Sequence, residues 1–348
     1  MKQALLRDIN ILDIVGTGPP ELPPGGVLVA MRAAALCRTD VKMIRQGHRD
    51  LVLPRIPGHE GVGQIIASDY PALPPGTMVA VYPGCYCGTC PACRQGQTAR
   101  CPSLSILGFN RDGLFRTIVP FDSEELASLV PCPPDLDPLV AVLAEPLACC
   151  LSALRKFPGR KRDNALVVGA GAVGCLFAVL LVSSGWQRVL ITDSDPARLD
   201  SEIPPGVEIL PATTGELPRI LSGMGLAASL RLLIPACPGG LDWPFWEAMA
   251  PGGCVSVFSG LEGTGESGRH EPSPLRRTGP GRFPRSGRAD GPGGNRHGPT
   301  PAKTCRLGGS PEPPPRPVPG QVIRNYRGGW HPGKYLLTLR MSLFDSDI

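Results

Sequence analysis

The stretch Ala165-Leu166-Val167-Val168-Gly169-Ala170-Gly171-Ala172-Val173-Gly174 decides the fold of the second half of the chain. Its first four residues form an apolar run typical of a buried parallel strand. The apolar residues Cys175–Ser184 come next and predict a helix. A second apolar strand, Arg188-Val189-Leu190-Ile191-Thr192-Asp193, ends in an acid. A strand, a glycine-rich turn, a helix, a strand and an acid in this order predict a dinucleotide-binding unit.

Each residue type in this turn has a physical reason. Gly169 permits the tight turn, Gly171 lets a pyrophosphate approach the backbone, and Gly174 lets the helix pack closely on the strand. The free N–H groups at the start of the helix bind phosphate. Asp193 lies 24 residues after Gly169, where its carboxylate can bind both ribose hydroxyls and would repel a 2′-phosphate. The sequence therefore predicts NAD rather than NADP.

The predicted cofactor-binding residues are Gly169, Gly171, Val173, Gly174, Asp193 and Arg198. For Arg198, a position near the adenine and a solvated position on a helix are both open. Three later segments fit the same sheet: a strand at Leu230–Ile234, a short helix at Trp243–Ala250 and a strand at Gly253–Phe258.

Four cysteines in one short stretch form the second motif. Cys87, Cys90, Cys93 and Cys101 follow the spacing C-x2-C-x2-C-x7-C, with proline and glycine between them. Turns of this kind let four thiolates converge on one ion, and a closed tetrahedral set is typical of structural zinc. Thiolates suit zinc or an iron–sulfur cluster better than magnesium or calcium. The alternative is four reduced cysteines in a loop, but the spacing favours zinc.

The first part of the chain reads as short strands broken by turns. Strands are predicted within residues 1–36, including 27–31, and at 64–67, 78–82 and 114–119, and together they suggest a small β-barrel. After a linker at 131–138, a single helix is predicted over Asp137–Leu154, with Asp137 as its N-cap and Pro138 in its first turn.

Cys37 and His59 are candidates for a second metal. Cys37 is followed by Arg38-Thr39-Asp40, and His59 lies within Pro57-Gly58-His59-Glu60-Gly61. A cysteine and a histidine among small, turn-forming residues are plausible metal ligands. Taken alone, His59 is also compatible with an ordinary hydrogen-bonded histidine.

Composition bounds the function further. A chain of 348 residues is long enough for two domains, and 42% hydrophobic residues supply their cores. The net charge of +5 comes from residues 268–348, which carry +9 against −4 in residues 1–267. The basic balance is therefore no sign that the folded body binds nucleic acid. The odd count of 13 cysteines, the metal-type spacing and the absence of a signal peptide or membrane-length apolar run predict a cytoplasmic protein without a membrane partner.

With these motifs in order, residues 1–265 resemble the zinc-dependent medium-chain alcohol dehydrogenases, and most closely the polyol and threonine dehydrogenase branch. The resemblance implies an α/β fold with a β-barrel. A GroES-like catalytic domain would span residues 1–155, and a Rossmann domain with a doubly wound parallel sheet would span 156–266. It also implies a catalytic zinc, a structural zinc, NAD and a small alcohol substrate. A homo-oligomer is left open.

The resemblance also assigns roles to residues. It implies that Cys37, His59 and Glu145 bind the catalytic zinc and that Glu60 can exchange with water at the metal. Asp40 would orient the imidazole, and Thr39 would relay the proton outward. Cys149 and Cys150 are nearby rivals to Glu145 as ligands. Beyond Thr39 the family often has a histidine where this chain has Lys42, so water, Lys42 and His48 are all open as the next relay group.

Residues 267–348 depart from the family. The segment 268–348 holds 14 Pro and 14 Gly, a composition that cannot bury a core and predicts disorder. We interpret the abrupt change as a frameshift or a sequencing error, with a genuine basic extension as the alternative. Two functions follow: a zinc- and NAD-dependent dehydrogenase of a secondary alcohol or polyol, or a family-derived protein that binds zinc and nucleotide without turnover.

Overall fold

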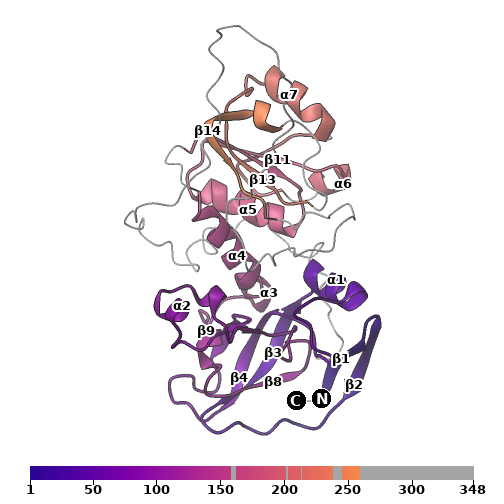
Figure 1. The fold of residues 1–348 in the computed structure, drawn as a ribbon, viewed down its shortest axis with the longest axis vertical. Helices are drawn as coiled ribbons and strands as arrows, with labels where there is room; N and C mark the ends of the chain where they lie inside the picture. Colours follow the sequence, from indigo (N-terminus) through magenta and orange to yellow (C-terminus); the bar gives the residue numbers. More distant parts are fainter. Residues whose placement is uncertain (158–161, 201–202, 213, 238–244, 259–348) are drawn as a thin grey trace, which may run out of the picture. The chain divides into compact units, whose positions relative to one another are not determined.

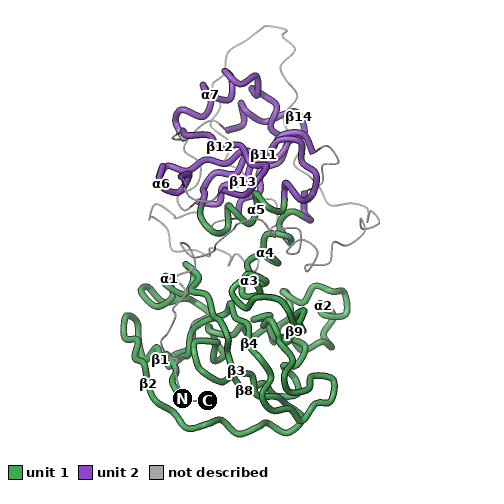
Figure 2. Tube along the Cα trace, turned by 180° about the vertical axis from the view of Figure 1, so that it is seen from behind, with its two compact units in different colours: residues 1–154, 171–180, 318–348 green, residues 155–170, 181–317 purple. Residues whose placement is uncertain are grey.

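Two sheets organise the chain, one antiparallel and one parallel (Figure 1). The structure is a computed structural model that describes residues 1–157, 162–200, 203–212, 214–237 and 245–258. These residues form two units: the first holds Met1–Leu154 and Gly171–Leu180, and the second holds Arg155–Ala170 and the described residues from Leu181 onward (Figure 2). The tail predicted for residues 267–348 lies outside the described residues.

The first unit is built on a five-stranded antiparallel sheet with the order β8-β3-β4-β5-β9. Its strands are β3 (Val27–Ala35), β4 (Glu60–Ser68), β5 (Met78–Val81), β8 (Ile118–Phe121) and β9 (Leu129–Pro131). Val27, Val29, Val79 and Phe121 are fully buried and form the centre of its core. Two further pairs flank the sheet: β1 (Lys2–Asp8) with β2 (Ile11–Gly16), and β6 (Gly84–Cys85) with β7 (Ser105–Ile106).

Short helices complete this unit. They are α1 (Arg38–Gln46), α2 (Pro91–Arg94), α3 (Pro138–Ala141) and α4 (Ala144–Leu154), with 3₁₀ turns η1 (Thr98–Arg100) and η2 (Leu126–Ser128). Helix α3 lies against β3 and β4, and α4 lies against β4 and β5. This packing fixes the position of the side chains that α4 offers to the site.

The single helix predicted over Asp137–Leu154 is wrong, because the structure has two helices in its place. Asp137 is the N-cap of α3, as predicted, and accepts a hydrogen bond from the Leu139 N–H. The break falls at Val142 and Leu143. Pro146 explains it, because its ring lacks an N–H and would collide with the carbonyl of the residue four positions earlier in a continuous helix.

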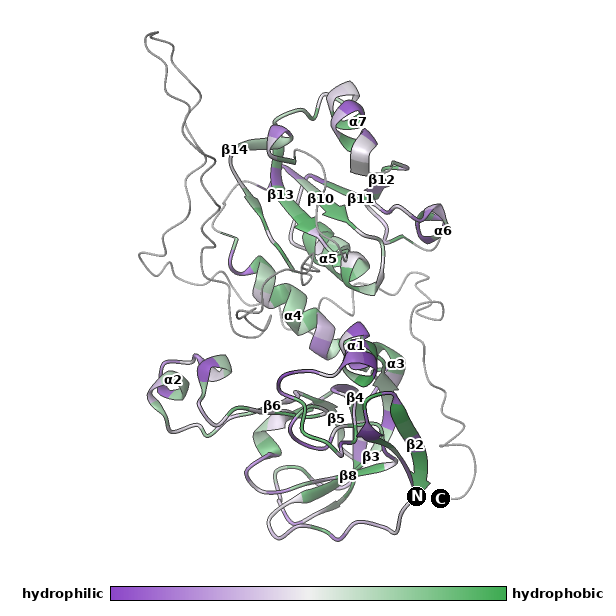
Figure 3. Cartoon of the chain, turned by 45° about the vertical axis from the view of Figure 1, so that its right-hand side comes forward, coloured by the Kyte–Doolittle hydropathy of each residue, from purple (hydrophilic) through white to green (hydrophobic). Residues whose placement is uncertain are grey.

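The second unit contains a parallel sheet with the order β12-β11-β10-β13-β14. Its strands are β10 (Asn164–Val168), β11 (Arg188–Thr192), β12 (Val207–Ile209), β13 (Leu230–Pro235) and β14 (Met249–Val255). Helix α5 (Ala172–Ser183) connects β10 to β11 along the chain, and its residues up to Leu180 belong to the first unit. After it come α6 (Pro196–Leu199), η3 (Thr214–Glu216), α7 (Leu217–Gly223) and η4 (Phe245–Glu247). Figure 3 shows β10 and β11 in the hydrophobic colour, as expected for strands covered on both faces. The predicted Rossmann sheet is confirmed.

Three predicted boundaries are wrong. The strand predicted at 114–119 begins only at Ile118, because the N–H groups of Leu114 and Phe115 bind the carbonyls of Gly58 and Pro57 instead. The helix predicted at Trp243–Ala250 is a 3₁₀ turn at Phe245–Glu247, and its first two residues lie outside the described part. The strand predicted at 253–258 runs from Met249 to Val255, because its pairing with β13 begins at Met249.

Within the described residues, every helix is too short or too polar to span a bilayer.

Candidate active site

The pairing of β3 with β4 brings Cys37 and His59 together. Ala35, the last residue of β3, pairs with Glu60, the first residue of β4. Cys37 follows Ala35 by two residues, and His59 directly precedes Glu60. Two residues that are 22 positions apart in the sequence therefore meet at one end of an antiparallel ladder.

Asp40 holds both of these residues. Cys37 is the N-cap of α1, and the Asp40 carboxylate accepts a hydrogen bond from its backbone N–H over 3.0 Å. The other carboxylate oxygen lies 3.0 Å from Nδ1 of His59. Asp40 is fully buried. A carboxylate accepts only, so Nδ1 carries a proton and Nε2 is the ring nitrogen that can bind a metal.

Cys37, His59 and Glu60 form a group whose ligand atoms all lie within 4.8 Å of one another. His59 and Glu60 are buried. Burial by itself lowers the pKa of His59, but hydrogen bonds to Asp40 and Cys37 raise it well above its usual value. Burial raises the pKa of Glu60 to about 7, and the charges of Glu145 and Asp40 add to this effect. Sequence reasoning placed Glu60 beside the metal, and the structure puts it in the group itself.

Glu145 lies next to this group, although it is not one of the three within 4.8 Å. It stands in the first turn of α4, and its Oε1 accepts a hydrogen bond from the Cys149 thiol over 3.3 Å. Burial raises the pKa of Glu145. Burial also raises the pKa of the Cys149 thiol, and the charges of Glu145, Glu60 and Cys37 raise it further. Two carboxyl groups, Glu60 and Glu145, and two thiols, Cys37 and Cys149, thus interact with one another in one partly buried site.

This donor set fits a divalent cation. A thiol, an imidazole and a carboxyl group converge, and a second carboxyl group lies beside them. Acidic groups that share a buried site raise one another's pKa, and a cation at the centre removes that penalty. Sulfur, nitrogen and oxygen donors together suit zinc, and three protein ligands are typical of a catalytic zinc with an open position.

Cys150, the second predicted rival, is fully buried. Tyr82 is a neighbour of the site that sequence reasoning missed. Burial raises its pKa, and the charges of Tyr86, Cys149 and Glu145 act on it. Tyr82 directly follows β5, the strand against which α4 lies. A sequence prediction of that packing would have placed Tyr82 near Glu145.

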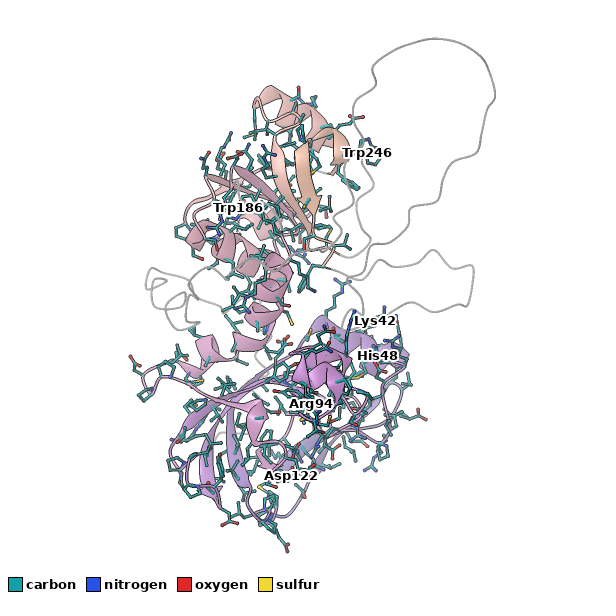
Figure 4. All side chains as sticks on the ribbon, turned by 60° about the vertical axis from the view of Figure 1, so that its left-hand side comes forward. Lys42, His48, Arg94, Asp122, Trp186 and Trp246 are labelled. Atoms are coloured by element: carbon teal, nitrogen blue, oxygen red, sulfur yellow. The ribbon has the colours of Figure 1, made fainter. Side chains whose placement is uncertain are left out.

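The proposed relay residues belong to α1 and the loop after it. Thr39 is exposed in the first turn of α1, directly between Arg38 and Asp40. Lys42 is exposed on the same helix, and His48 is half-buried just beyond its end (Figure 4). The ring of Phe109 stands edge-on to His48 with centroids 5.1 Å apart and lies 5.6 Å from the ring of His59. Phe109 therefore contacts both imidazoles, a role that the sequence did not indicate.

The four cysteines of the loop converge as predicted. The sulfurs of Cys87, Cys90, Cys93 and Cys101 all lie within 4.8 Å of one another. Backbone N–H groups point at these sulfurs, with Cys90 N donating to Cys87 over 3.4 Å and Cys93 N donating to Cys90 over 3.5 Å. Such bonds from Thr89 and Cys90 lower the pKa of Cys87 to about 6, whereas burial raises the pKa of Cys93 to about 12. One cation can stabilise all four thiolates together, so the loop fits a closed zinc site.

Gly169 and Gly171 have the local geometry that the glycine-rich turn requires. Gly169 has φ +112°, and an added Cβ would lie 2.8 Å from the Ala236 carbonyl oxygen, so only glycine fits there. At Gly171 an added Cβ would meet nothing within 4 Å, which leaves the backbone open to a ligand. Val173 and Gly174 stand in the first turn of α5.

Asp193 is hydrogen-bonded to the backbone of this turn. One oxygen of its buried carboxylate accepts the Ala170 N–H over 2.7 Å, and the other accepts the Asp195 N–H over 2.9 Å. Nη1 of Arg198 lies 3.4 Å from the same carboxylate. The sequence did not indicate that Asp193 also fixes the shape of the turn. Its predicted contact with ribose stays a prediction.

Known proteins resemble both units. Residues 23–133 match the family described as alcohol dehydrogenase GroES-like domain. Over 268 residues the chain is 33% identical to D-altritol 5-dehydrogenase of Agrobacterium fabrum, covering 73% of this chain and 76% of that relative. The chain belongs to the zinc-dependent medium-chain alcohol dehydrogenase family. Membership confirms the resemblance and makes the chain an oxidoreductase of alcohols, with zinc and a nicotinamide nucleotide as cofactors.

Solved structures of such dehydrogenases share the fold. An Escherichia coli structure described as a short chain alcohol dehydrogenase complexed with NADH has a TM-score of 0.65 at 25% identity and covers 73% of this chain and 75% of that chain. A Sinorhizobium meliloti structure described as a zinc-binding dehydrogenase bound to NADP has a TM-score of 0.66 at 24% identity, with 75% and 79% covered. The GroES-like and Rossmann architecture expected from sequence is confirmed.

Proposed function

We propose that this alcohol dehydrogenase oxidises a secondary hydroxyl of a polyol or related sugar alcohol and passes the hydride to NAD. The observation that carries the proposal is the group of Cys37, His59 and Glu60 with Asp40 behind it. A relative that matches 73% of this chain, a D-altritol 5-dehydrogenase, supports the polyol class.

In this proposal Cys37, His59 and Glu60 hold the catalytic zinc, and Glu145 is the neighbouring carboxylate that can take part. Bound zinc supplies a Lewis acid that makes an alcohol hydroxyl easier to deprotonate. The bound nicotinamide supplies the carbon that accepts the hydride. Asp40 keeps the His59 ring in the tautomer and orientation that a ligand needs. The exposed Thr39 hydroxyl, beside Asp40 on α1, accepts the alcohol's proton and passes it outward.

NAD is proposed over NADP because of Asp193. A buried carboxylate beside the turn favours hydroxyl donors on the ribose and repels a 2′-phosphate. Its ties to Ala170 and Asp195 hold it there. Arg198 would favour a 2′-phosphate, but its ion pair with Asp193 weakens that attraction. The four-cysteine loop is proposed to hold a second, structural zinc. The cytoplasmic location and the homo-oligomer stay predictions.

The test uses the full chain after its mass has been verified. Bound zinc is counted, and reduction of NAD and of NADP is followed across D-altritol, other polyols, L-threonine and simple secondary alcohols. We expect two zinc ions and reduction of NAD with polyols. His59→Ala should lose one zinc and the activity, whereas Cys132→Ala, a half-buried cysteine outside both metal groups, should keep them. Two zinc ions without any reduction would favour the alternative of a protein that only binds zinc and nucleotide.

A further inference from the structure

Helix α4 places a thiol beside the Glu145 carboxylate. Cys149 follows Glu145 by four residues, so the two side chains are neighbours on one face of the helix. The Cys149 thiol donates a hydrogen bond to Oε1 of Glu145 over 3.3 Å, at a partly buried position. The mechanism proposed above gives this contact no role.

We propose that Cys149 is a positioning residue that fixes the Glu145 carboxylate at the edge of the zinc site and is not a zinc ligand itself. This inference rests on the proposed function, because it assumes a zinc ion among Cys37, His59 and Glu60.

The geometry distinguishes a thiol that binds zinc from a thiol that donates a hydrogen bond to Glu145. The sulfur of Cys149 is not among the ligand atoms that lie within 4.8 Å of one another, although the charges of Cys37 and Glu60 reach it. Its hydrogen bond engages Oε1 of Glu145 and leaves Oε2 outside this contact. A glutamate side chain has several rotatable bonds, and one hydrogen bond to a neighbour on the same helix restricts them.

The packing of α4 places the restricted Glu145 side chain near Glu60. The helix lies against β4, whose first residue is Glu60, and against β5. Glu145 is therefore held close enough to Glu60 for the charge of one to raise the pKa of the other. Glu145 can take part in binding the metal, and removing the hydrogen-bond partner of a metal-binding side chain typically changes metal affinity by about 10- to 100-fold.

The experiment compares three variants of the full chain. Cys149→Ala removes the donor, and Cys149→Ser keeps a donor at the same position. Cys132→Ala is the matched control, because Cys132 is half-buried in the same unit and its sulfur points to the Val130 carbonyl. Where Cys149→Ala does not fold, Cys149→Val removes the donor without opening a cavity. Release of zinc to the chelator 4-(2-pyridylazo)resorcinol is followed over time, and the zinc in the four-cysteine loop serves as an internal reference.

We expect Cys149→Ala to release one zinc about 10-fold faster or more, and Cys149→Ser and Cys132→Ala to stay within about threefold of the unmodified protein. In cobalt-substituted protein, the thiolate-to-cobalt absorption should be the same with and without Cys149. The inference is overturned if Cys149→Ala releases zinc at the normal rate, if Cys149→Ser is as fast as Cys149→Ala, or if the absorption falls. A protein that binds zinc only in the loop overturns the proposed function as well, which distinguishes the two failures.

Discussion

Gly113 supports the loop that carries His59, and a single methyl group there should disturb it. The segment after Gly113 pairs with the backbone before His59: Leu114 N donates to the Gly58 carbonyl and Phe115 N to the Pro57 carbonyl, both over 3.0 Å. In Gly113→Ala the new Cβ would lie 2.2 Å from the Gly58 oxygen and 2.5 Å from the Pro57 oxygen. Ordinary contact begins at 3.4 Å, so the two backbones must separate.

The size of the effect follows from these contacts. Both colliding atoms belong to the backbone, so no side-chain rotation can relieve the clash. Overpacking costs about 1–3 kcal/mol, and each of the two backbone hydrogen bonds that would be strained contributes about 0.5–1.5 kcal/mol. We therefore expect the free energy of unfolding to fall by about 2–6 kcal/mol. A displacement of about 1 Å at a catalytic group costs about 100-fold in rate, so the activity should fall more than the stability alone explains.

The assay is urea denaturation followed by circular dichroism, together with zinc content and NAD reduction at a temperature where the variant is folded. The control is Gly18→Ala in the same unit, where an added Cβ meets nothing within 4 Å and φ is not positive. The control should match the unmodified protein within about 1 kcal/mol. If Gly113→Ala has the same denaturation midpoint and the same zinc content as the control, the proposed support of the His59 loop is wrong.

Three further predictions concern single side chains. Asp40→Asn replaces one acceptor oxygen by a donor, so it should lose one of the two hydrogen bonds to His59 and Cys37. In a chelator competition, zinc binding at that site should weaken by about 10- to 100-fold, and zinc binding in the four-cysteine loop should not change. Cys101→Ala removes a buried thiolate from the loop, so metal analysis should show one zinc fewer and calorimetry a lower midpoint; an unchanged zinc count would argue against the loop site. Burial lowers the pKa of His48 below its usual 6.5, so the unfolded chain binds this proton more readily and the free energy of unfolding falls as the pH drops below 6.5. His48→Gln should therefore lose less stability than the unmodified protein between pH 7.5 and pH 5.5 in denaturation, and an equal loss in both proteins would contradict a lowered pKa of His48.

The parallel sheet could be predicted because buried parallel strands are continuous apolar runs. Leu166 and Leu190 are fully buried at the centres of the two strands that flank the glycine-rich turn. Helix α1 was missed because Asp40 and Met43 are its only buried residues, so it has almost no apolar face to recognise. Its sequence does hold weaker signals, an acid in the first turn and Gly47 after the last one.

The sequence could predict which residue types bind a metal in the site, but not the distances between them. Cysteine and histidine between small residues indicate ligands, and the β3–β4 pairing confirms that Cys37 and His59 meet. The resemblance assigned Glu145 as the third ligand and Glu60 as its neighbour, but both are carboxylates, and the structure places Glu60 rather than Glu145 within 4.8 Å of Cys37 and His59. The predicted helix already placed Cys149 four residues after Glu145, but a thiol at that position could equally be a metal ligand, and only the 3.3 Å contact with Glu145 indicates a donor.

The four-cysteine loop is closed at its base by the short β6–β7 pair, and all its sulfurs come from a span of 15 residues. So short a span needs no distant partner to gather its ligands, because the entropy lost on closing it is small. We therefore expect the loop to bind zinc during synthesis, before the flanking strands of the barrel have paired. A peptide of residues 84–106 should behave as an autonomous, transplantable module whose order depends on metal rather than on the rest of the protein.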